Sequence, residues 1–274
     1  MFTGKNEMEK FDLLIIDDEK VIIDFFIKIS EAENLFIDTA SDGLQGIQKL
    51  LSNNYKLIVC DLILPDKSGF EILDAARLNN ILTPIIVTSG YSTIENAIRA
   101  LKTGAIDFLP KPFTFDEVLC CLKRGFNYSN ILLQQIEASI DDKSTDLLFV
   151  PCPPSYFRFG LSTWIKIESD KTVTTGLTDL TIRTISKLEK VNLLQTKDRI
   201  EQGREHLSLN CDLGLEHKIL SPISGDVFQI NEAIISNPSL VEKDPFFEGW
   251  IYKIKPSDLE TELAFLTSCS TDRF

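Results

Sequence analysis

Polar side chains stand directly after four short apolar runs in the first half of the chain. Asp17 and Asp18 follow FDLLII, and Asp61 follows KLIVC. Thr88 follows PIIV, and Lys111 follows AIDFLP. Strands buried in a parallel sheet have continuous hydrophobic sequences, and ligands bind beyond the carboxyl ends of such strands. We therefore expect these five side chains to converge on one edge of a sheet.

The residue types at this edge suit phosphoryl transfer. Three crowded carboxylates resist ionisation unless a cation neutralises them. Mg²⁺ prefers carboxylate oxygens and bridges to phosphate, so Asp18 and Asp61 are predicted ligands, with Asp17 acting mainly through a metal-bound water. Asp61 is the predicted nucleophile, because a carboxylate can form an acyl phosphate. Thr88 would donate a hydrogen bond to the phosphoryl oxygens, and Lys111 would supply positive charge.

The elements that must position these residues alternate between strands and helices. Stretches between the apolar runs carry apolar residues three and four apart, which is typical of helices that pack on a sheet. The fifth such helix should run from about residue 115 to residue 140. The pattern predicts an α/β domain with five helices and five parallel strands, at residues 11–17, 35–40, 56–61, 84–89 and 105–110.

The first half resembles the receiver domain of two-component response regulators over about residues 10–130. The motifs that carry the resemblance are LLIIDDE, IVCDLILPDKSGFEIL, IIVTSGY and the Lys-Pro pair in FLPKPF. The resemblance implies a flavodoxin-like fold and a bacterial phosphoprotein. It also implies Mg²⁺-dependent phosphorylation by a sensor histidine kinase, within a phosphorelay.

The same resemblance implies roles for further residues. The backbone carbonyl of Ile63 would be a metal ligand, and the peptide between Lys111 and Pro112 would be cis. Phe108 would be an aromatic switch that turns inward as Thr88 moves toward the phosphoryl group. An ordinary core phenylalanine on the last strand is the alternative for Phe108.

The alternation of apolar runs and amphipathic stretches ends near DDKSTDLLFVPCPPSYFRFG, at residues 141–160. Acidic, Ser/Thr and Pro residues there predict a boundary. We expect a receiver domain at 10–130, a helix extension and linker at 131–160, and a second domain at 161–274. Short strand-like runs separated by turn sequences predict a small, mainly antiparallel β domain after the boundary.

Residues 164–262 resemble the glycine cleavage system H protein, a relative of lipoyl domains. The resemblance rests on TWIKI, VTTGLTDLTIRTISKLEKVNLL and SPISGDVFQINEAIISNPSLVEKDPFFEGWIYKIKPSD. It implies a barrel-sandwich hybrid fold, in which a lysine at the tip of a hairpin carries lipoate. Within these motifs, WIYKIK alternates as expected of an edge strand.

The hairpin lacks the lysine that this family modifies. Counting back from Pro222 without gaps places Gly214 at the modified position, and glycine has no amine to acylate. We therefore expect no lipoate and interpret this half as a degenerate docking module. The alternative is a lipoyl carrier modified at Lys218, four residues away. His206 and His217 are expected to be surface residues without metal-ligand spacing.

Composition limits the partners. Twenty-eight basic against forty-one acidic residues give a net charge of −13, which repels nucleic acid and anionic membranes. The six cysteines lack C-x-x-C spacing and indicate reduced thiols, and the N-terminus resembles neither a signal peptide nor a membrane span. We expect a cytoplasmic protein that is not an enzyme. Its partners would be a histidine kinase, an unknown protein and, after phosphorylation, a second copy in a homodimer.

Overall fold

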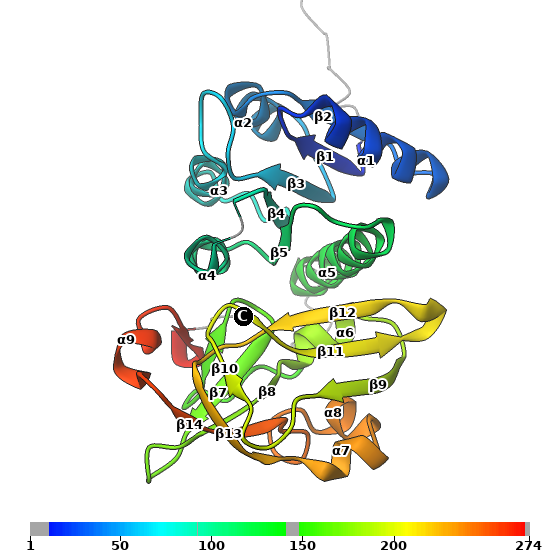
Figure 1. The fold of residues 1–274 in the computed structure, drawn as a ribbon. Coiled ribbons are helices and arrows are strands. Elements are labelled where there is room, and N and C mark those ends of the chain that lie inside the picture. Colours follow the sequence, from blue (N-terminus) through cyan, green and yellow to red (C-terminus); the bar gives the residue numbers. More distant parts are fainter. Residues whose placement is uncertain (1–10, 92, 141–147, 272–274) are drawn as a thin grey trace, which may run out of the picture.

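The computed structural model describes residues 11–91, 93–140 and 148–271 of the 274-residue chain. Two bodies lie one above the other in Figure 1, and each contains its own sheet structure. The upper body holds the first half of the chain, and the lower body holds the second half. Among the described residues, no helix has both the length and the apolar character that crossing a bilayer requires.

The first body is a five-stranded parallel sheet in the order β2-β1-β3-β4-β5, as predicted for an α/β receiver fold. Its helices lie on both faces. The strands are β1 (Leu13–Ile16), β2 (Ile37–Ala40), β3 (Leu57–Asp61), β4 (Ile85–Ser89) and β5 (Asp107–Pro110). The helices are α1 (Lys20–Ala32), α2 (Gly43–Ser52), α3 (Gly69–Leu78), α4 (Ile94–Thr103) and α5 (Phe115–Ile140).

Each face of this sheet has its own hydrophobic core, which explains why β1 is apolar throughout. Leu13 and Ile15 pack in one cluster with residues of α1 and α5. Leu14 and Ile16 pack in the other cluster, with residues of α2, α3 and α4. Because successive side chains of a strand point to opposite faces, a run of four buried residues is needed to serve both cores.

The second body is mainly antiparallel β-structure, as predicted. It contains a seven-stranded sheet, β10-β13-β14-β8-β7-β6-β15, and a three-stranded sheet, β12-β11-β9. The strands are β6 (Phe157–Phe159), β7 (Thr163–Ile167), β8 (Val173–Leu177), β9 (Leu188–Leu193), β10 (Arg199–Ile200), β11 (Glu205–Cys211), β12 (Glu216–Leu220), β13 (Gly225–Ile230), β14 (Tyr252–Pro256) and β15 (Thr267–Ser268). Among the described residues, short α-helices complete it: α6 (Asp179–Thr184), α7 (Glu232–Ser236), α8 (Ser239–Lys243) and α9 (Leu259–Leu263), together with 3-10 turns at Asp212–Gly214 and Cys269–Thr271.

The expectation that WIYKIK forms an edge strand is wrong. Strand β14 lies between β13 and β8, with partners on both sides. Its alternation arises because Tyr252 and Ile254 point into the core, while Lys253 and Lys255 point outward. Alternation reports that one face of a strand is buried, and it does not report whether the strand has one neighbour or two.

The expectation that both histidines lie at the surface is also wrong. His206 and His217 are 2% and 3% exposed, respectively. His206 Nδ1 lies 2.9 Å from the carbonyl oxygen of Ile219, and His217 Nδ1 lies 2.8 Å from Cys120 Sγ. Burial lowers the pKa of His206 to about 4 and that of His217 to about 3. Both imidazoles are therefore neutral at pH 7 and satisfied inside the fold.

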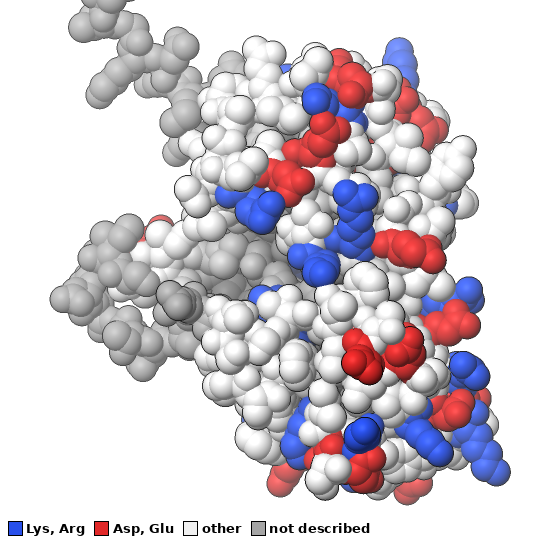
Figure 2. All heavy atoms as spheres, turned by 90° about the vertical axis from the view of Figure 1, so that its left-hand side faces the viewer, with Lys and Arg blue, Asp and Glu red and all other residues white. Residues whose placement is uncertain are grey.

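Charged side chains on the face shown in Figure 2 are of both signs. Lys and Arg alternate with Asp and Glu over both bodies on that face. The net charge of −13 therefore does not produce a single large acidic patch on this side of the molecule.

Candidate functional site

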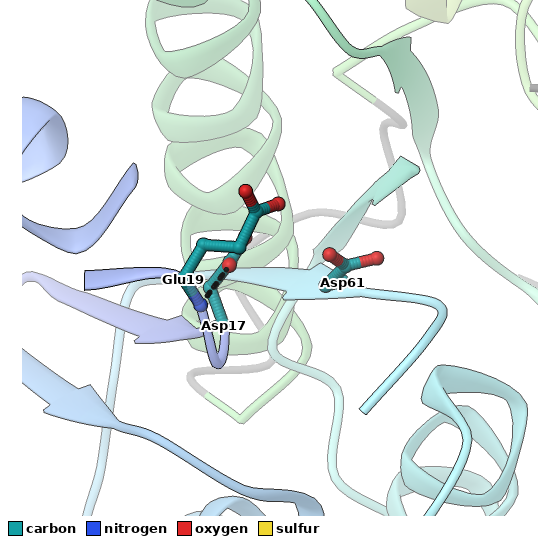
Figure 3. A group of neighbouring side chains, drawn as sticks. All are labelled: Asp17, Glu19 and Asp61. Carbon is teal, nitrogen blue, oxygen red and sulfur yellow. Dashed lines mark hydrogen bonds between the residues drawn. The ribbon is translucent and has the colours of Figure 1, made fainter. Parts of the chain in front are cut away.

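Three carboxylates meet at the carboxyl edge of the first sheet. Asp17 follows β1 directly, and Asp61 is the last residue of β3, which pairs with β1 in parallel. Glu19 lies two residues beyond Asp17, and its amide donates to Asp17 Oδ1 at 2.9 Å. One carboxylate oxygen from each of the three residues lies within 4.8 Å of the others (Figure 3). Asp17 and Asp61 are only 2% and 4% exposed, so water screens their charges poorly.

Lys111 joins these carboxylates through its ammonium group. Lys111 follows β5, and its Nζ lies 2.5 Å from Asp61 Oδ2. The same Nζ lies 2.8 Å from Asp17 Oδ2 and 2.8 Å from Glu19 Oε1. Burial acts to lower the pKa of this ammonium, but its hydrogen bonds to the carboxylates outweigh burial and raise that pKa above its usual value. Lys111 therefore stays charged and offsets part of the negative charge.

The balance of charge at the site remains negative. Burial raises the pKa of Asp17 to about 6, although hydrogen bonds from Lys111 and from the Glu19 amide oppose that change. The neighbouring Asp61 carboxylate adds to the effect of burial. One ammonium among three clustered carboxylates leaves an oxygen-rich, negatively charged site. Such a donor set fits a hard divalent cation such as Mg²⁺.

Thr88 supplies a buried hydroxyl beside Asp61. The two residues are register partners on the adjacent strands β3 and β4. Thr88 is 0% exposed, and among the described residues its Oγ1 has no hydrogen-bond partner. A buried hydroxyl without a partner carries a desolvation cost that an added acceptor oxygen would remove. The position therefore suits an oxygen of a group attached to Asp61.

The loop after β3 holds Asp61 in place through its backbone. The amide of Ile63 donates to Asp61 Oδ1 at 3.0 Å. A Cβ at Gly69, the first residue of α3, would lie only 2.5 Å from the Asp61 carbonyl oxygen. Ser68 and Glu71 form a capping box that starts α3 at this point. Within the sequence DKSGFE, Gly69 has no side chain, so the start of α3 can lie directly against the backbone of Asp61.

The structure brings together some of the residues expected at the site and leaves one apart. Asp17, Asp61 and Lys111 are in contact, and Thr88 is adjacent. Asp18 is exposed, and its carboxylate does not belong to the group formed by the other acids. Glu19 belongs to that group and was not expected. Its signal in the sequence was the last letter of LLIIDDE, two residues after Asp17.

Two further features of the receiver resemblance can be located. The peptide bond between Lys111 and Pro112 is cis. Phe108 is 8% exposed and packs in the cluster that contains Val87 and Ala97, on the same face as α4. The side chain is therefore part of the core in this conformation, next to the strand that carries Thr88.

Comparison with protein families defines both halves. Residues 13–123 match the model of the response regulator receiver domain, and residues 157–272 match that of the glycine cleavage H-protein. The chain therefore carries a response regulator receiver domain followed by a glycine cleavage H-protein domain. They are called the receiver domain and the H-like domain below.

Individual relatives resemble parts of the chain. The transcriptional regulatory protein CusR of Escherichia coli K12 is 31% identical over 136 residues, which cover 50% of this chain and 60% of that protein. The cell cycle response regulator CtrA of Brucella ovis is 31% identical over 141 residues, which cover 49% of this chain and 61% of that protein. The chain thus spans about three fifths of the length of these curated relatives.

Solved structures match each half separately. The receiver domain of the Francisella response regulator 1452 has 34% identity and a TM-score of 0.41, covering 42% of this chain and 96% of that one. The glycine cleavage system H protein of Mycobacterium marinum has 22% identity and a TM-score of 0.36, covering 39% of this chain and 87% of that one.

Proposed function

We propose that this protein is a two-component response regulator that accepts a phosphoryl group on Asp61 and signals through its H-like domain. The observation that carries the proposal is the cluster of Asp17, Glu19, Asp61 and Lys111. Beside it lies the Thr88 hydroxyl, which makes no hydrogen bond with any described residue. A sensor histidine kinase would be the phosphoryl donor. The receiver resemblance over residues 13–123 supports the same role.

The chemistry assigns a separate task to each group. An Asp61 carboxylate oxygen attacks the phosphorus atom, a P–O bond forms, and the bond from phosphorus to the donor breaks. Mg²⁺ would be held by Asp17, Asp61 and the Ile63 carbonyl, with Glu19 beside them, and would neutralise the carboxylates and the incoming phosphoryl oxygens. Asp18, which is exposed and lies outside this group, would have to turn inward to become a ligand. Lys111 supplies a positive charge already within reach of Asp61, and Thr88 donates its free hydroxyl to a phosphoryl oxygen.

Replacing the acceptor tests this assignment. Asp61→Asn should abolish labelling by acetyl phosphate and Mg²⁺, because a carboxamide cannot form the acyl phosphate. Intact-mass spectrometry would detect the phosphoryl increment on the unchanged protein and its absence on the variant. Asp74→Asn is the matched control, since Asp74 lies on α3 with its side chain 47% exposed. Labelling of Asp61→Asn at the rate of the unchanged protein would reject the assignment.

The H-like domain is proposed to work as a protein-interaction module without lipoate. Gly214 lies in the turn between β11 and β12, is exposed, and has a φ of 72°. A Cβ built there would meet no atom within 4 Å, so the position projects into open space. The hairpin thus retains an exposed turn of the kind that would carry a modified lysine, with a residue that cannot be acylated.

The second candidate function is a lipoyl carrier modified at Lys218. Lys218 lies within strand β12 rather than in the turn, and its Nζ forms an ion pair of 2.9 Å with Glu117 of α5. An acceptor lysine must reach the active site of a ligase, which this pairing opposes. Intact-mass analysis of protein made in lipoate-competent cells distinguishes the two functions. A lipoyl increment on a peptide that contains Lys218 would favour the carrier.

The remaining parts of the proposal concern organisation. We assign residues 10–130 to the receiver domain, 131–160 to a helix extension and linker, and 161–274 to the H-like domain. The protein would act in the cytoplasm without a turnover substrate of its own, without binding nucleic acid or membranes. A phosphorylation-dependent homodimer is the proposed oligomeric change.

A further inference from the structure

The H-like domain packs against the side of the receiver domain formed by α4, β5 and α5 (Figure 1). On α4, Ile98 and Leu101 are 7% and 6% exposed, and both belong to the hydrophobic cluster that forms the core of the H-like domain. A Cβ at Gly203, which lies between β10 and β11, would be only 2.8 Å from Ile98 Cγ1. The two domains are therefore closely packed along this part of α4.

The close packing is interrupted beside β5, where a cleft of about 500 Å³ lies between the domains. Ile94, Phe108 and Leu109 line it from the receiver domain, and His217 and Leu220 of β12 line it from the H-like domain. Sites for small molecules commonly have such volumes, lie between domains, and are mostly apolar with a few polar groups. The cleft thus has the size and the place of a ligand site.

The basic side chains of the lining are neutralised by acidic partners. Arg124 of α5 pairs with Asp107 at 3.1 Å, and Lys218 pairs with Glu117 at 2.9 Å. Arg204 also has an acidic partner. Among the described residues, every basic side chain of the lining is therefore paired. An anionic ligand would lose its hydration without gaining a free cation, so the cleft favours a neutral molecule.

The two remaining acidic side chains of the lining offer little attraction to a cation. Glu205 and Glu216 are exposed, so water screens their charges. Glu205 Oε2 also lies 4.0 Å from Lys218 Nζ, and the Ser208 hydroxyl donates to Glu216 Oε1. The interior of the cleft therefore carries no strong net charge.

Buried polar side chains of the lining have hydrogen-bonding capacity left. His217 is 3% exposed, and its Nδ1 lies 2.8 Å from Cys120 Sγ. The other ring nitrogen, Nε2, makes no hydrogen bond with any described residue, and protein atoms do not fully enclose it. Because the side chain lines the cleft and is otherwise buried, we place Nε2 toward the cleft. Arg124 is 8% exposed, and its Nε likewise has no partner among the described residues.

We propose that the cleft binds a neutral, mainly apolar small molecule of roughly two or three rings, which packs against Phe108, Leu109 and Leu220. A neutral imidazole nitrogen pairs with a hydroxyl, amide or amine, so His217 Nε2 forms a hydrogen bond with such a group of the ligand. The ligand gives the apolar walls contacts that a void cannot provide. Each domain contributes one wall, and Asp61 is not part of the lining.

A fluorescent probe tests the site in the full chain. N-phenyl-1-naphthylamine is neutral, has an aromatic body and one N–H group, and becomes brighter in apolar surroundings. Protein titrated into a low, fixed concentration of this probe should give saturable binding with a Kd on the order of 10 µM, typical of a ligand of this size. Absence of saturable binding would overturn the proposal.

An anionic analogue tests the preference for a neutral ligand. 1-Anilinonaphthalene-8-sulfonate has the same rings and carries a sulfonate. It should bind roughly tenfold more weakly than the neutral probe, because the cleft has no free cation to replace the hydration of the sulfonate. Equal or tighter binding of the anion would contradict the assigned ligand class.

Variants distinguish the cleft from the open groove beside Trp250, which also has apolar walls. Leu220→Trp fills the cleft and should weaken binding of the neutral probe about tenfold, because the probe loses its contacts. Ile235→Glu should leave the affinity unchanged, since Ile235 is 61% exposed and lines the other groove. Asp61→Asn should also leave it unchanged, which keeps the test independent of the proposed function. Unchanged affinity in Leu220→Trp, or a loss in Ile235→Glu, would overturn the proposal.

Nuclear Overhauser effects in the unchanged protein locate the probe without relying on the folding of a variant. In protein with labelled Ile and Leu methyl groups, the aromatic protons of the bound probe should show effects to Ile94, Leu109 and Leu220. The nitrogen resonance of His217 Nε2 should shift in the same sample, because a hydrogen bond changes the shielding of an imidazole nitrogen. Effects confined to Ile235, or an unshifted His217 Nε2 at saturation, would reject the proposed mode of binding.

Discussion

The acidic pocket of the receiver domain and the hairpin of the H-like domain differ in how their polar groups are satisfied. In the pocket, two buried carboxylates and the exposed Glu19 crowd around one ammonium, and the Thr88 hydroxyl has no partner in the part of the chain that the structure describes. In the hairpin, Lys218 is paired with Glu117, His217 contacts Cys120, and the turn presents Gly214. The polar groups of the pocket are thus incompletely satisfied, whereas those of the hairpin are paired with residues of the receiver domain.

The largest expected effect concerns the two buried histidines, which occur only in the H-like domain. Their pKa values are lowered to about 4 and about 3, so the unfolded chain binds more protons than the folded chain below about pH 6.5. Stability is therefore lost as the pH falls from about 6.5 toward these values. At pH 5 each histidine should reduce the free energy of unfolding by about 2 kcal/mol relative to pH 8.

Urea unfolding at pH 8 and pH 5 measures this loss. The variants His206→Gln and His217→Gln should each show a smaller loss than the unchanged protein, and the comparison cancels the contribution of the carboxylates. Equal losses in all three proteins would mean that neither histidine is buried as a neutral group.

Removing the cation of the pocket should have the next largest effect. Lys111→Met should slow labelling by acetyl phosphate roughly 100-fold, because a preorganised charge next to the transferred group is lost. The control is Lys67→Met, whose ammonium pairs with Glu71 at 2.8 Å on the exposed surface. A similar slowing in both variants would show that the effect arises from net charge rather than from contact with Asp61.

Two buried threonines offer a direct test of the unpartnered hydroxyl. Thr88→Val should raise the free energy of unfolding by about 1 kcal/mol, because it removes a buried hydroxyl that makes no hydrogen bond to the described residues. Thr175→Val should lower it by about 1 kcal/mol, since Thr175 Oγ1 donates to the Trp164 carbonyl at 2.8 Å. Both residues are 0% exposed. Destabilisation of similar size in both variants would indicate that Thr88 is already satisfied.

A change in stability no larger than that of the threonine variants is expected at the turn of the hairpin. Gly214→Lys should cost about 1 kcal/mol, because a positive φ is unfavourable for residues with a Cβ. The same variant should gain a lipoyl group in lipoate-competent cells if the hairpin has kept the shape that a ligase recognises. Intact-mass analysis measures the gain, and Asp212→Lys in the same turn is the control for position. Equal modification of both variants would show that the position of the lysine does not matter.

The sequence was sufficient to predict the sheet and most of the pocket for a physical reason. Parallel strands place their carboxyl ends at one edge, so residues that follow separate apolar runs, such as Asp17 and Asp61, could be brought together without knowledge of the packing. Glu19 was missed, because the spacing after a strand end does not reveal which side chains turn inward. Asp18 was expected to be a direct ligand and instead lies exposed beside the group.

The burial of the histidines could not be predicted from local sequence. His217 finds its partner, Cys120, 97 positions away in the other domain. His206 is covered by packing against Tyr252, with 5.7 Å between the ring centroids. The His217 contact depends on how the two domains meet, and the His206 contact depends on the tertiary fold of the H-like domain. Neither a spacing nor a periodicity in the chain encodes these arrangements. The local sequence of α4 likewise does not show that Ala97 and Ala100 pack in the receiver core while Ile98 and Leu101 pack in the core of the H-like domain.

The sharing of α4 between the domains has a consequence for synthesis on the ribosome. The receiver domain is made first and can fold before the rest of the chain is available, since domains tend to fold as units in order of synthesis. At that stage Ile98 and Leu101 have no cover, because the residues that bury them are translated later. The nascent protein therefore exposes these apolar side chains until the H-like domain, which places Gly160 next to Leu101 and Gly203 next to Ile98, has been synthesised. A chaperone that holds this helix would protect the chain during that interval.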